Sequence, residues 1–377
     1  IVSVVDYTNT FQNNSLTITP NGSQKIGGVN ANFVANTEGQ SLTFVYVDDT
    51  EGWKNVQDST SNATGNAFLV ATGGTITCCG NFKIHTFTGP GTFTVSQTAV
   101  CAADNAVDYL VVAGGASGGM SNGNQGSAGG GGAGGFRVSN DTCMPGPQTS
   151  PLANPSGITV TATAFPITVG GGGAQISGPS NVKGNSGSNS IFSTIISAGG
   201  GGGGGSNTPE AAAAGGSGGG GRAGSNNSGG AGNTPPVSPP QGQNGGDAPS
   251  SPGDSAGISA GGGGAGQVGQ SANGGEGSFV VQAGFAGCNG TTGPVSGARY
   301  FAGGGGRGGA CTPACNSGGS GGAGGGGAGG NKGPSGAAAG TAGSTNTGGG
   351  GGASGSLPGP SNGAGGSGIV ILRYKYK

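Results

Sequence analysis

Short apolar stretches alternate with runs of glycine through most of this chain. Residues 190–197, Ser-Ile-Phe-Ser-Thr-Ile-Ile-Ser, have the composition of a strand and continue directly into residues 198–205, one alanine followed by seven glycines. The same succession recurs at residues 111–115, 167–174, 258–264 and 300–306. β-Branched and aromatic residues favour strands. The pattern therefore predicts a series of strands that each lead into a glycine segment.

The glycine runs have two physical interpretations. They are flexible linkers if they behave as random coils, because ordering glycine has a large entropic cost. They form a packed array if neighbouring runs adopt helices of the polyproline II type, whose outward-pointing backbone groups bond to one another once no Cβ atom keeps the chains apart. Each bond contributes about 1 kcal/mol net, against roughly 1–2 kcal/mol of backbone entropy per residue, so an array needs fixed ends. The apolar stretches supply such ends, and we predict a polyglycine II array. A collagen helix is excluded because the glycines lack a strict period of three.

The first 70 residues have the pattern of a small β domain. Strands are expected at residues 1–5, 15–19, 31–34 and 41–47, with Asn/Gly turns between them. Trp53, the only tryptophan, is expected to anchor the core of this domain. The acidic residues 48–51 lack the spacing of an EF-hand loop and are expected to form a solvated turn. Because the sequence opens within a predicted strand, we expect further residues upstream of Ile1.

Residues 71–113 have the pattern of a second β unit, with strands at residues 73–77, 82–87, 92–95 and 107–112. Residues 82–87 alternate with a period of two, which predicts a half-buried strand with His85 on its surface side. Residues 114–367 form the glycine-rich domain, and residues 368–377 a closing strand that we expect to pair with residues 107–112 or 92–95. The predicted fold class is all-β plus polyglycine II with essentially no α-helix.

Composition and charge exclude several classes of function. Of the 377 residues, 99 are glycine and only 7% are charged, with a net charge of −1, so the clustered basic surface of a nucleic-acid-binding protein is not expected. No apolar run approaches the roughly 20 residues that span a bilayer, so we expect no membrane insertion. With one histidine and no Cys-x-x-Cys pair, we expect no metal site. The many Gly-x-Gly-x-x-Gly matches carry no information in this composition, and we expect no cofactor.

The seven cysteines are an odd number, so at least one is unpaired within the chain or pairs between chains. Their loop-like placement is typical of surface disulfides in an extracellular protein. Cys311 and Cys315 form either a local disulfide or two free thiols. The candidate disulfide cysteines are Cys78, Cys79, Cys101, Cys143, Cys288, Cys311 and Cys315.

Five segments together carry a family resemblance: residues 4–11, 16–22, 44–53, 107–115 and 367–374. They include Val4-Val-Asp-Tyr-Thr-Asn-Thr-Phe11 and the closing Ser367-Gly-Ile-Val-Ile-Leu-Arg-Tyr374. They resemble segments of tail-fibre and related structural proteins of tailed bacteriophages, particularly phages of aquatic bacteria. The glycine-rich part is also similar to the distal receptor-binding adhesins of long tail fibres, in which polyglycine II helices form a layered sandwich and loops at its tip bind the host receptor. This chain departs from those adhesins in its β clamp made from both ends, its many cysteines and its long proline-rich loops.

The resemblance implies a virion structural protein of the tail fibre or tail tip that binds a host surface glycan or outer-membrane protein. It also implies contact with other tail or fibre proteins through the N-terminal β region, and a homo-oligomer, with a trimer favoured. Loops on a rigid scaffold commonly carry recognition. Aromatic or basic residues beside the predicted loops are therefore the candidate receptor contacts, with packing in the array as the alternative for the two phenylalanines. These candidates are Phe285, Arg299, Tyr300, Phe301 and Arg307.

A structural extracellular fibril or virion decoration protein without a receptor role is the alternative. Such a protein would carry glycans at Asn-x-Ser/Thr sequons, which occur at Asn13, Asn21, Asn62, Asn140, Asn226 and Asn289. Enzymatic activity is not expected, because glycan cleavage uses paired carboxylates and those of the glycine-rich region are isolated in sequence. The isolated carboxylates are Asp141, Glu210, Asp247, Asp254 and Glu276.

Overall fold

The chain divides into two compact units. The computed structural model describes residues 1–58, 68–99, 101–121, 126–141, 149–178, 181–205, 211–222, 227–249, 258–310, 317–333, 336–356 and 361–377. The units are Ile1–Ala67 and Phe68–Lys377, and each is described by itself. The first unit therefore ends three residues before the expected boundary at residue 70, because Val70 pairs with Gln97 of the second unit.

The first unit is a small antiparallel β domain. A sheet in the order β1 (Val2–Val5), β4 (Ser41–Asp48), β5 (Gly52–Asp58) accompanies a hairpin of β2 (Leu16–Ile18) and β3 (Phe33–Ala35). Leu42 and Phe44 are buried, and Trp53 packs against them, as the sequence predicted. The expected acidic turn is also present, since the Asp48 carboxylate accepts hydrogen bonds from the N–H groups of Thr50 (2.8 Å) and Glu51 (2.7 Å).

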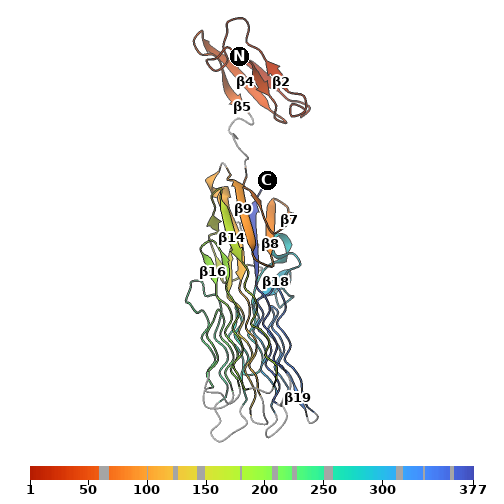
Figure 1. The fold of residues 1–377 in the computed structure, drawn as a ribbon. Coiled ribbons are helices and arrows are strands. Elements are labelled where there is room, and N and C mark those ends of the chain that lie inside the picture. Colours follow the sequence, from red (N-terminus) through yellow and green to blue (C-terminus); the bar gives the residue numbers. More distant parts are fainter. Residues whose placement is uncertain are drawn as a thin grey trace. The chain divides into compact units, whose positions relative to one another are not determined.

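Two sheets occupy one end of the second unit (Figure 1). The first has the order β12 (Ala153–Asn154), β11 (Phe136–Ser139), β10 (Ala106–Val112), β21 (Ile369–Lys375), β8 (Phe82–Phe87), β7 (Thr75–Cys79), with β13 (Ile158–Thr159) also paired to β10. The second has the order β16 (Ile195–Ser197), β15 (Ser190–Phe192), β14 (Ala164–Thr168), β9 (Gly91–Gln97), β6 (Val70–Thr72). The remaining elements are the hairpins β17 (Ser278–Val281) with β18 (Ala298–Phe301) and β19 (Lys332–Gly333) with β20 (Gly336–Ala337), and the short turns η1 (Ala102–Asn105) and η2 (Gln282–Ala286). The predicted all-β class with essentially no α-helix is confirmed.

The last strand lies at the centre of the first sheet. β21 pairs antiparallel with β10, with Val112 opposite Ile369, which confirms the first of the two expected pairings. Its other edge pairs with β8, whereas β9 belongs to the second sheet. Alternate residues of β10 and β21 enter two cores: Leu110 and Ile371 face the β17–β18 hairpin, and Val111 and Leu372 face the second sheet. A buried ion pair at 3.0 Å between Asp108 and Arg373 links the two strands.

His85 is buried, and its expected position on a surface is wrong. Its side chain is fully inaccessible because the second sheet covers that face of β8. The ring lies between Tyr374 and Phe93, with centroid distances of 5.5 and 5.1 Å. Nδ1 is 2.7 Å from the carbonyl oxygen of Gly73, and Nε2 is 3.3 Å from the Tyr374 hydroxyl. Burial lowers the pKa of His85, so the ring is neutral near pH 7.

The glycine segments form an ordered array around residues 126–135, the central segment. Each of its N–H groups from Gly129 to Gly135 donates to another segment, at 2.7–3.0 Å. The acceptors repeat with a period of three. Gly129, Gly132 and Gly135 donate to residues 204, 201 and 198; Gly130 and Ala133 to residues 260 and 263; Gly131 and Gly134 to residues 351 and 348. A polyglycine II helix has three residues per turn, and its backbone hydrogen bonds all go to neighbouring segments, as they do here.

Six segments surround the central segment and form a closed ring. Besides the three that accept its hydrogen bonds, three others donate to its carbonyl groups, through Gly119, Gly220 and Gly305. Adjacent members of the ring also bond to one another. In order around the ring, the segments are residues 113–121, 198–205, 215–222, 258–265, 302–310 and 348–356. The packing is therefore hexagonal, and every described residue of the central segment is buried.

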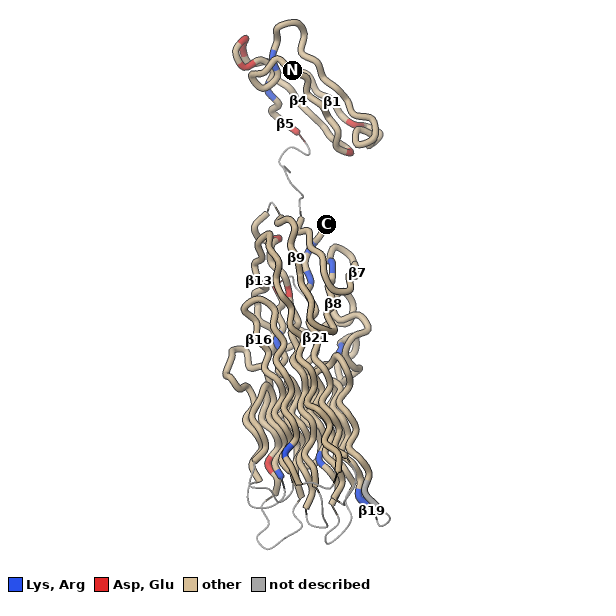
Figure 2. The backbone as a smooth tube through the Cα atoms, viewed as in Figure 1, with Lys and Arg blue, Asp and Glu red and all other residues tan. Residues whose placement is uncertain are grey.

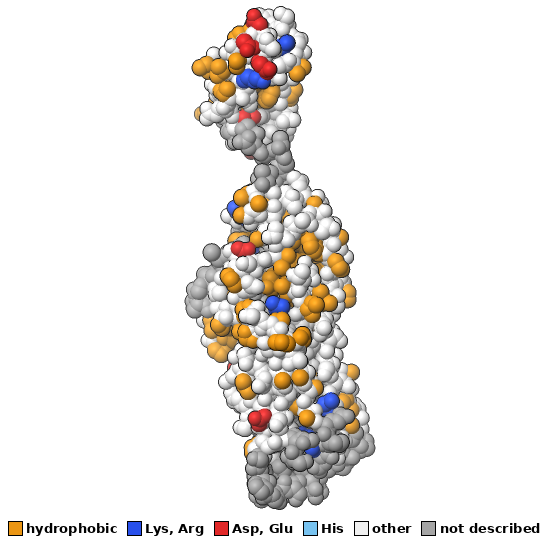
Figure 3. All heavy atoms as spheres, turned by 90° about the vertical axis from the view of Figure 1, so that its left-hand side faces the viewer, with side chains coloured by type: hydrophobic (Ala, Val, Ile, Leu, Met, Phe, Trp, Pro, Cys, Tyr) orange, Lys and Arg blue, Asp and Glu red, His pale blue; other side chains and the backbone are white. Residues whose placement is uncertain are grey.

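Strands fix the ends of the array nearest the sheets. β10 continues into segment 113–121, the central segment continues into β11, and segment 361–368 continues into β21 (Figure 1). Apolar burial in the sheets thus supplies the stabilisation that glycine backbone alone lacks. Figure 3 shows the same division, with hydrophobic side chains gathered over the sheets and mostly backbone and small side chains on the array.

Candidate functional site

The segments reverse direction at the end of the array away from the sheets, hereafter the far end. Segment 113–121 arrives there and the central segment leaves, and the Ser121 hydroxyl donates to the carbonyl oxygen of Gly126 at 2.9 Å. Of the chain between these segments, residues 206–210, 311–316 and 357–360 lie outside the described residues, as do Asn62 and Asn226 of the sequons. The site is therefore built from the segment ends that bear these connections.

Buried serines line the far end. Ser127 and Ser259 approach each other at 2.6 Å between their hydroxyl oxygens, and both are inaccessible. The Ser259 hydroxyl donates to the carbonyl oxygen of Ala128 at 2.7 Å, and the Ser354 hydroxyl accepts from the N–H of Ser121 at 2.9 Å. These hydroxyls satisfy backbone groups where the glycine pattern stops. They give the far end a polar interior.

Two arginines are buried in this polar interior. Arg222 is 4% exposed and Arg307 is 8% exposed. The Nε atom of each, and Nη1 of Arg307, are buried without a hydrogen-bond partner. Burial lowers the pKa of both guanidinium groups, and no carboxylate among the described residues opposes that shift. Both groups are thus desolvated cations that no described acidic side chain neutralises.

The hydrogen-bond register places the two arginines at the same level. Segment 258–265 lies between their segments, with Ala260 donating to Gly221 (2.9 Å) and Gly262 donating to Gly305 (2.9 Å). Arg222 is the residue after Gly221, and Arg307 is two residues after Gly305. Each arginine therefore lies within about one residue of Ser259 or Ala260 along the array axis, a rise of about 3 Å.

Among the described residues of the far end, cations outnumber carboxylates. Lys183 and Lys332 also belong to segments that end there, and Figure 2 shows Lys and Arg positions near this end. Asp247 is the described carboxylate of this region, and it accepts a hydrogen bond from the N–H of Gly229 at 2.8 Å. The sequence has two further carboxylates, Glu210 and Asp254, which lie outside the described residues.

Three of the predicted contact residues are buried at the sheet end. Phe285, Tyr300 and Phe301 are 1%, 4% and 0% exposed. Phe285 and Phe301 belong to the core beside β10, the packing role that the sequence left open for the phenylalanines. The Tyr300 hydroxyl accepts from the N–H of Val295 at 3.2 Å. These side chains are occupied by packing and hydrogen bonding at the sheet end, so the expectation that they form a receptor-binding surface is corrected.

The two predicted arginines lie at opposite ends of the array. Arg299 is at the sheet end, where its guanidinium donates to the carbonyl oxygens of Asn289 (2.9 Å), Cys288 (3.0 Å) and Gly290 (2.5 Å). Only Arg307 lies at the far end. Sequence analysis missed Arg222, although both far-end arginines follow four glycines, at residues 218–221 and 303–306. That repeated Gly-Gly-Gly-Gly-Arg sequence was the available signal.

The described cysteines do not form disulfides. Cys78, Cys79, Cys101 and Cys288 are exposed free thiols, which corrects the expected bridges at these positions. Cys78 and Cys79 are neighbours on β7, so their side chains point to opposite faces of the strand and cannot both face one partner. Cys143, Cys311 and Cys315 lie outside the described residues.

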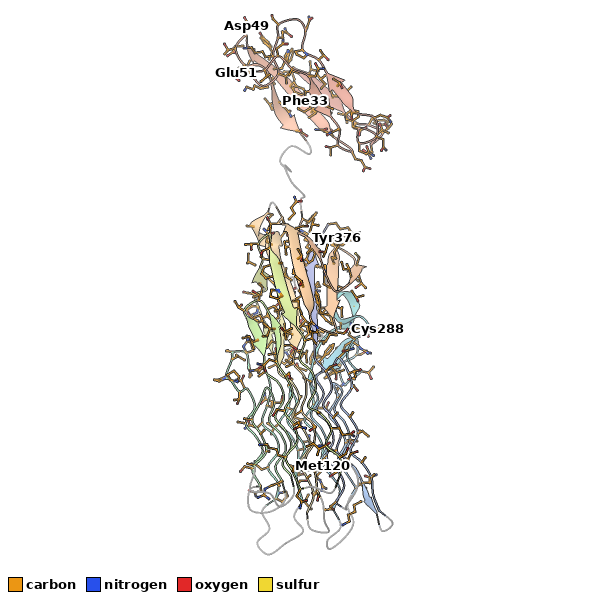
Figure 4. All side chains as sticks on the ribbon, viewed as in Figure 1. Phe33, Asp49, Glu51, Met120, Cys288 and Tyr376 are labelled. Atoms are coloured by element: carbon orange, nitrogen blue, oxygen red, sulfur yellow. The ribbon has the colours of Figure 1, made fainter. Side chains whose placement is uncertain are left out.

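A groove of about 790 Å³ lies beside β7 and the turn η2. Its lining includes Thr75, Thr77, Cys79, Thr86 and Cys288, and none of its lining residues, all of them described, is charged. Figure 4 shows Cys288 on this flank of the sheets and Met120 in the far half of the array. The groove is therefore separate from the far end.

The described residues include no group of three or more metal-ligating side chains. In the same part of the chain, no helix is both long and apolar enough to cross a membrane.

The family comparison matches the array together with its strands. The family described as "Glycine-rich domain" matches residues 86–375, from within β8 to the end of β21. The chain belongs to this glycine-rich family. No curated protein matches the chain. The matched range contains the whole polyglycine array and the strands from β9 to β21, so the family match covers the far end.

Proposed function

We propose that this chain is a virion structural protein of a phage tail fibre or tail tip, and that it binds a host surface glycan or outer-membrane protein through its far end. The observation that carries the proposal is the closed hexagonal array, which gathers many chain reversals at one end of a scaffold held by strands at the other. Because binding to a rigid scaffold orders few groups, less entropy is lost on association.

The resemblance to tail-fibre proteins supports the remaining parts of the proposal. The N-terminal unit attaches the chain to other tail or fibre proteins, and the chain assembles as a homo-oligomer, with a trimer favoured, on the outside of the virion. Several copies on one particle multiply weak affinities through effective concentration. The proposed activity is binding, without an enzymatic step.

Immunogold electron microscopy of the source particles, with an antibody against residues 114–368, tests the location. We expect label at tail tips or fibre ends. Label spaced along a filament or over a capsid would instead support the fibril or decoration protein and overturn the proposal.

Competition for host adsorption tests the binding role. The purified full chain is expected to slow adsorption of the phage. A variant with residues 250–257 replaced by a Gly/Ser sequence of equal length should lose this effect. A matched replacement of residues 59–66, which belong to the first unit, should keep it. Equal competition by both variants would contradict recognition at the far end.

A further inference from the structure

Arg222 and Arg307 are buried cations of the described far end. Among the described residues, Nε of each and Nη1 of Arg307 have no hydrogen-bond partner, and burial lowers the pKa of both groups. Arginine remains protonated in proteins, so neither group escapes the desolvation cost by losing its proton. A buried cation without a partner is strongly unfavourable. The array therefore holds two positive charges at the end away from its two large sheets.

Other arginines of the second unit show how this chain normally satisfies a guanidinium. Arg299 donates to three backbone carbonyl groups, and Arg373, whose Nε is also buried without a hydrogen-bond partner, is neutralised by the Asp108 carboxylate at 3.0 Å. The far-end arginines have neither arrangement among the described residues. The nearest described carboxylate by register, Asp247, accepts its hydrogen bond from the N–H of Gly229 on the outer side of the array.

We propose that the far end binds an oxyanion, a carboxylate or phosphate group, which Arg222 and Arg307 neutralise. The inference rests on the proposed function, since it gives the chemical class of the receptor group that this end recognises. Guanidinium groups bind carboxylates and phosphates through charge-assisted hydrogen bonds, the strong class of hydrogen bond in proteins. Lys332, on a neighbouring segment end, adds positive potential that attracts such a group.

Both kinds of oxyanion occur on bacterial surfaces. Acidic sugars carry carboxylates, and glycolipid headgroups carry phosphates. The two differ in geometry and charge, so separate probes distinguish them. Sodium glucuronate represents the acidic sugar, and inorganic phosphate represents the phosphate group. Sodium chloride at equal ionic strength controls for general screening.

The test is thermal unfolding of the purified full chain as each probe is titrated. We expect glucuronate or phosphate to raise the Tm of the second unit in a saturable way, because a ligand that binds only the folded state stabilises it. Arg222→Gln and Arg307→Gln should each weaken the apparent affinity about tenfold or more. Arg299→Gln, which removes a guanidinium at the sheet end, should leave the response unchanged.

The glutamine variants remain informative because they are expected to fold. Removing an unpaired buried charge should leave the Tm without probe unchanged or higher. A response to both probes no larger than that to chloride would overturn the inference, as would an undiminished response in the double variant.

The chain's own Glu210 and Asp254 are the alternative counter-ions. If Glu210→Gln or Asp254→Asn lowers the Tm in the wild-type background but not in the Arg222→Gln/Arg307→Gln background, the carboxylates are internal and the inference fails. Failure of the inference is distinguishable from failure of the proposed function. Gold label at fibre ends without a probe response would contradict only the oxyanion-binding inference. A probe response with label over the capsid would contradict only the proposed adhesin role.

Discussion

Gly131 lies at the middle of the central segment, where the account predicts that a single methyl group disrupts the array. A Cβ atom at Gly131 would overlap the carbonyl oxygen of Ala116 and lie 2.8 Å from that of Ser117. Ordinary contact begins near 3.4 Å, so segment 113–121 would have to move outward by at least 3.4 − 2.8 = 0.6 Å. Backbone on the other sides of both segments opposes that movement, because the ring is closed.

The cost follows from the bonds that such a movement weakens. Three hydrogen bonds join segment 113–121 to the central segment, from Ala113, Ala116 and Gly119, at 3.0, 2.9 and 2.8 Å. At about 1 kcal/mol net each, their loss amounts to about 3 kcal/mol, similar to the roughly 1–3 kcal/mol measured for overpacked cores. For a unit that spans Phe68–Lys377, with an unfolding entropy of about 2.1 cal/mol/K per residue, each kcal/mol lowers the Tm by about 1.5 °C, so Gly131→Ala should lower it by about 5 °C.

Gly171→Ala is the matched control. Gly171 is exposed, and a Cβ atom there would meet no atom within 4 Å. Replacement of such a glycine restricts the unfolded chain, so this variant should be unchanged or more stable by up to about 1 kcal/mol. Differential scanning calorimetry of both variants measures the transition of the second unit. Equal Tm values for Gly131→Ala, Gly171→Ala and the wild type would refute the packed array.

Three further predictions concern the sheets. Asp108→Asn should destabilise the second unit by about 3–5 kcal/mol in denaturant unfolding, because it leaves the Arg373 charge buried without its partner, whereas Lys375→Gln at the exposed pair with Asp104 should cost less than about 1 kcal/mol. Stability should fall as the pH drops below 6.5, because unfolded His85 takes up a proton that the folded state resists, with a slope of at most about 1.4 kcal/mol per pH unit. In the native protein, a thiol reagent detected by mass spectrometry should modify the four exposed free cysteines, Cys78, Cys79, Cys101 and Cys288.

Each of these predictions has its own contradicting result. Equal losses for Asp108→Asn and Lys375→Gln would show that the buried pair does not hold β10 to β21. An unchanged pH profile in His85→Gln would assign the acid sensitivity to other groups. Protection of the four thiols until denaturation would contradict their exposure.

The alternation of strands and glycine segments was predictable from sequence, because apolar side chains mark the strands and the lack of side chains marks the glycine segments. Residues 107–112 and 369–375 are mainly apolar on both faces of their strands, and their pairing places one face of each in each of the two cores. The burial of His85 was not predictable in the same way. A period of two separates the faces of β8, but it does not reveal that a second sheet covers the face that bears His85.

The order of segments in the ring was equally inaccessible from sequence. Glycine segments of similar length have no side chains to distinguish one neighbour from another, and their register is inherited from the strands to which they are joined. For the same reason, the sequence could not assign loops to the two ends. Arg299 and Arg307 are only eight residues apart, yet one lies at the sheet end and the other at the far end.

Hydrogen exchange at the central segment tests the ordered array most directly. The N–H groups of residues 129–135 each donate to a neighbouring segment and are buried, so they exchange only when the array opens. The account predicts that peptides covering residues 113–121 and 126–135 stay protected as long as those of β10 and β21. Exchange of these peptides at the rate of an unstructured Gly/Ser chain, while the strands remain protected, would contradict the account.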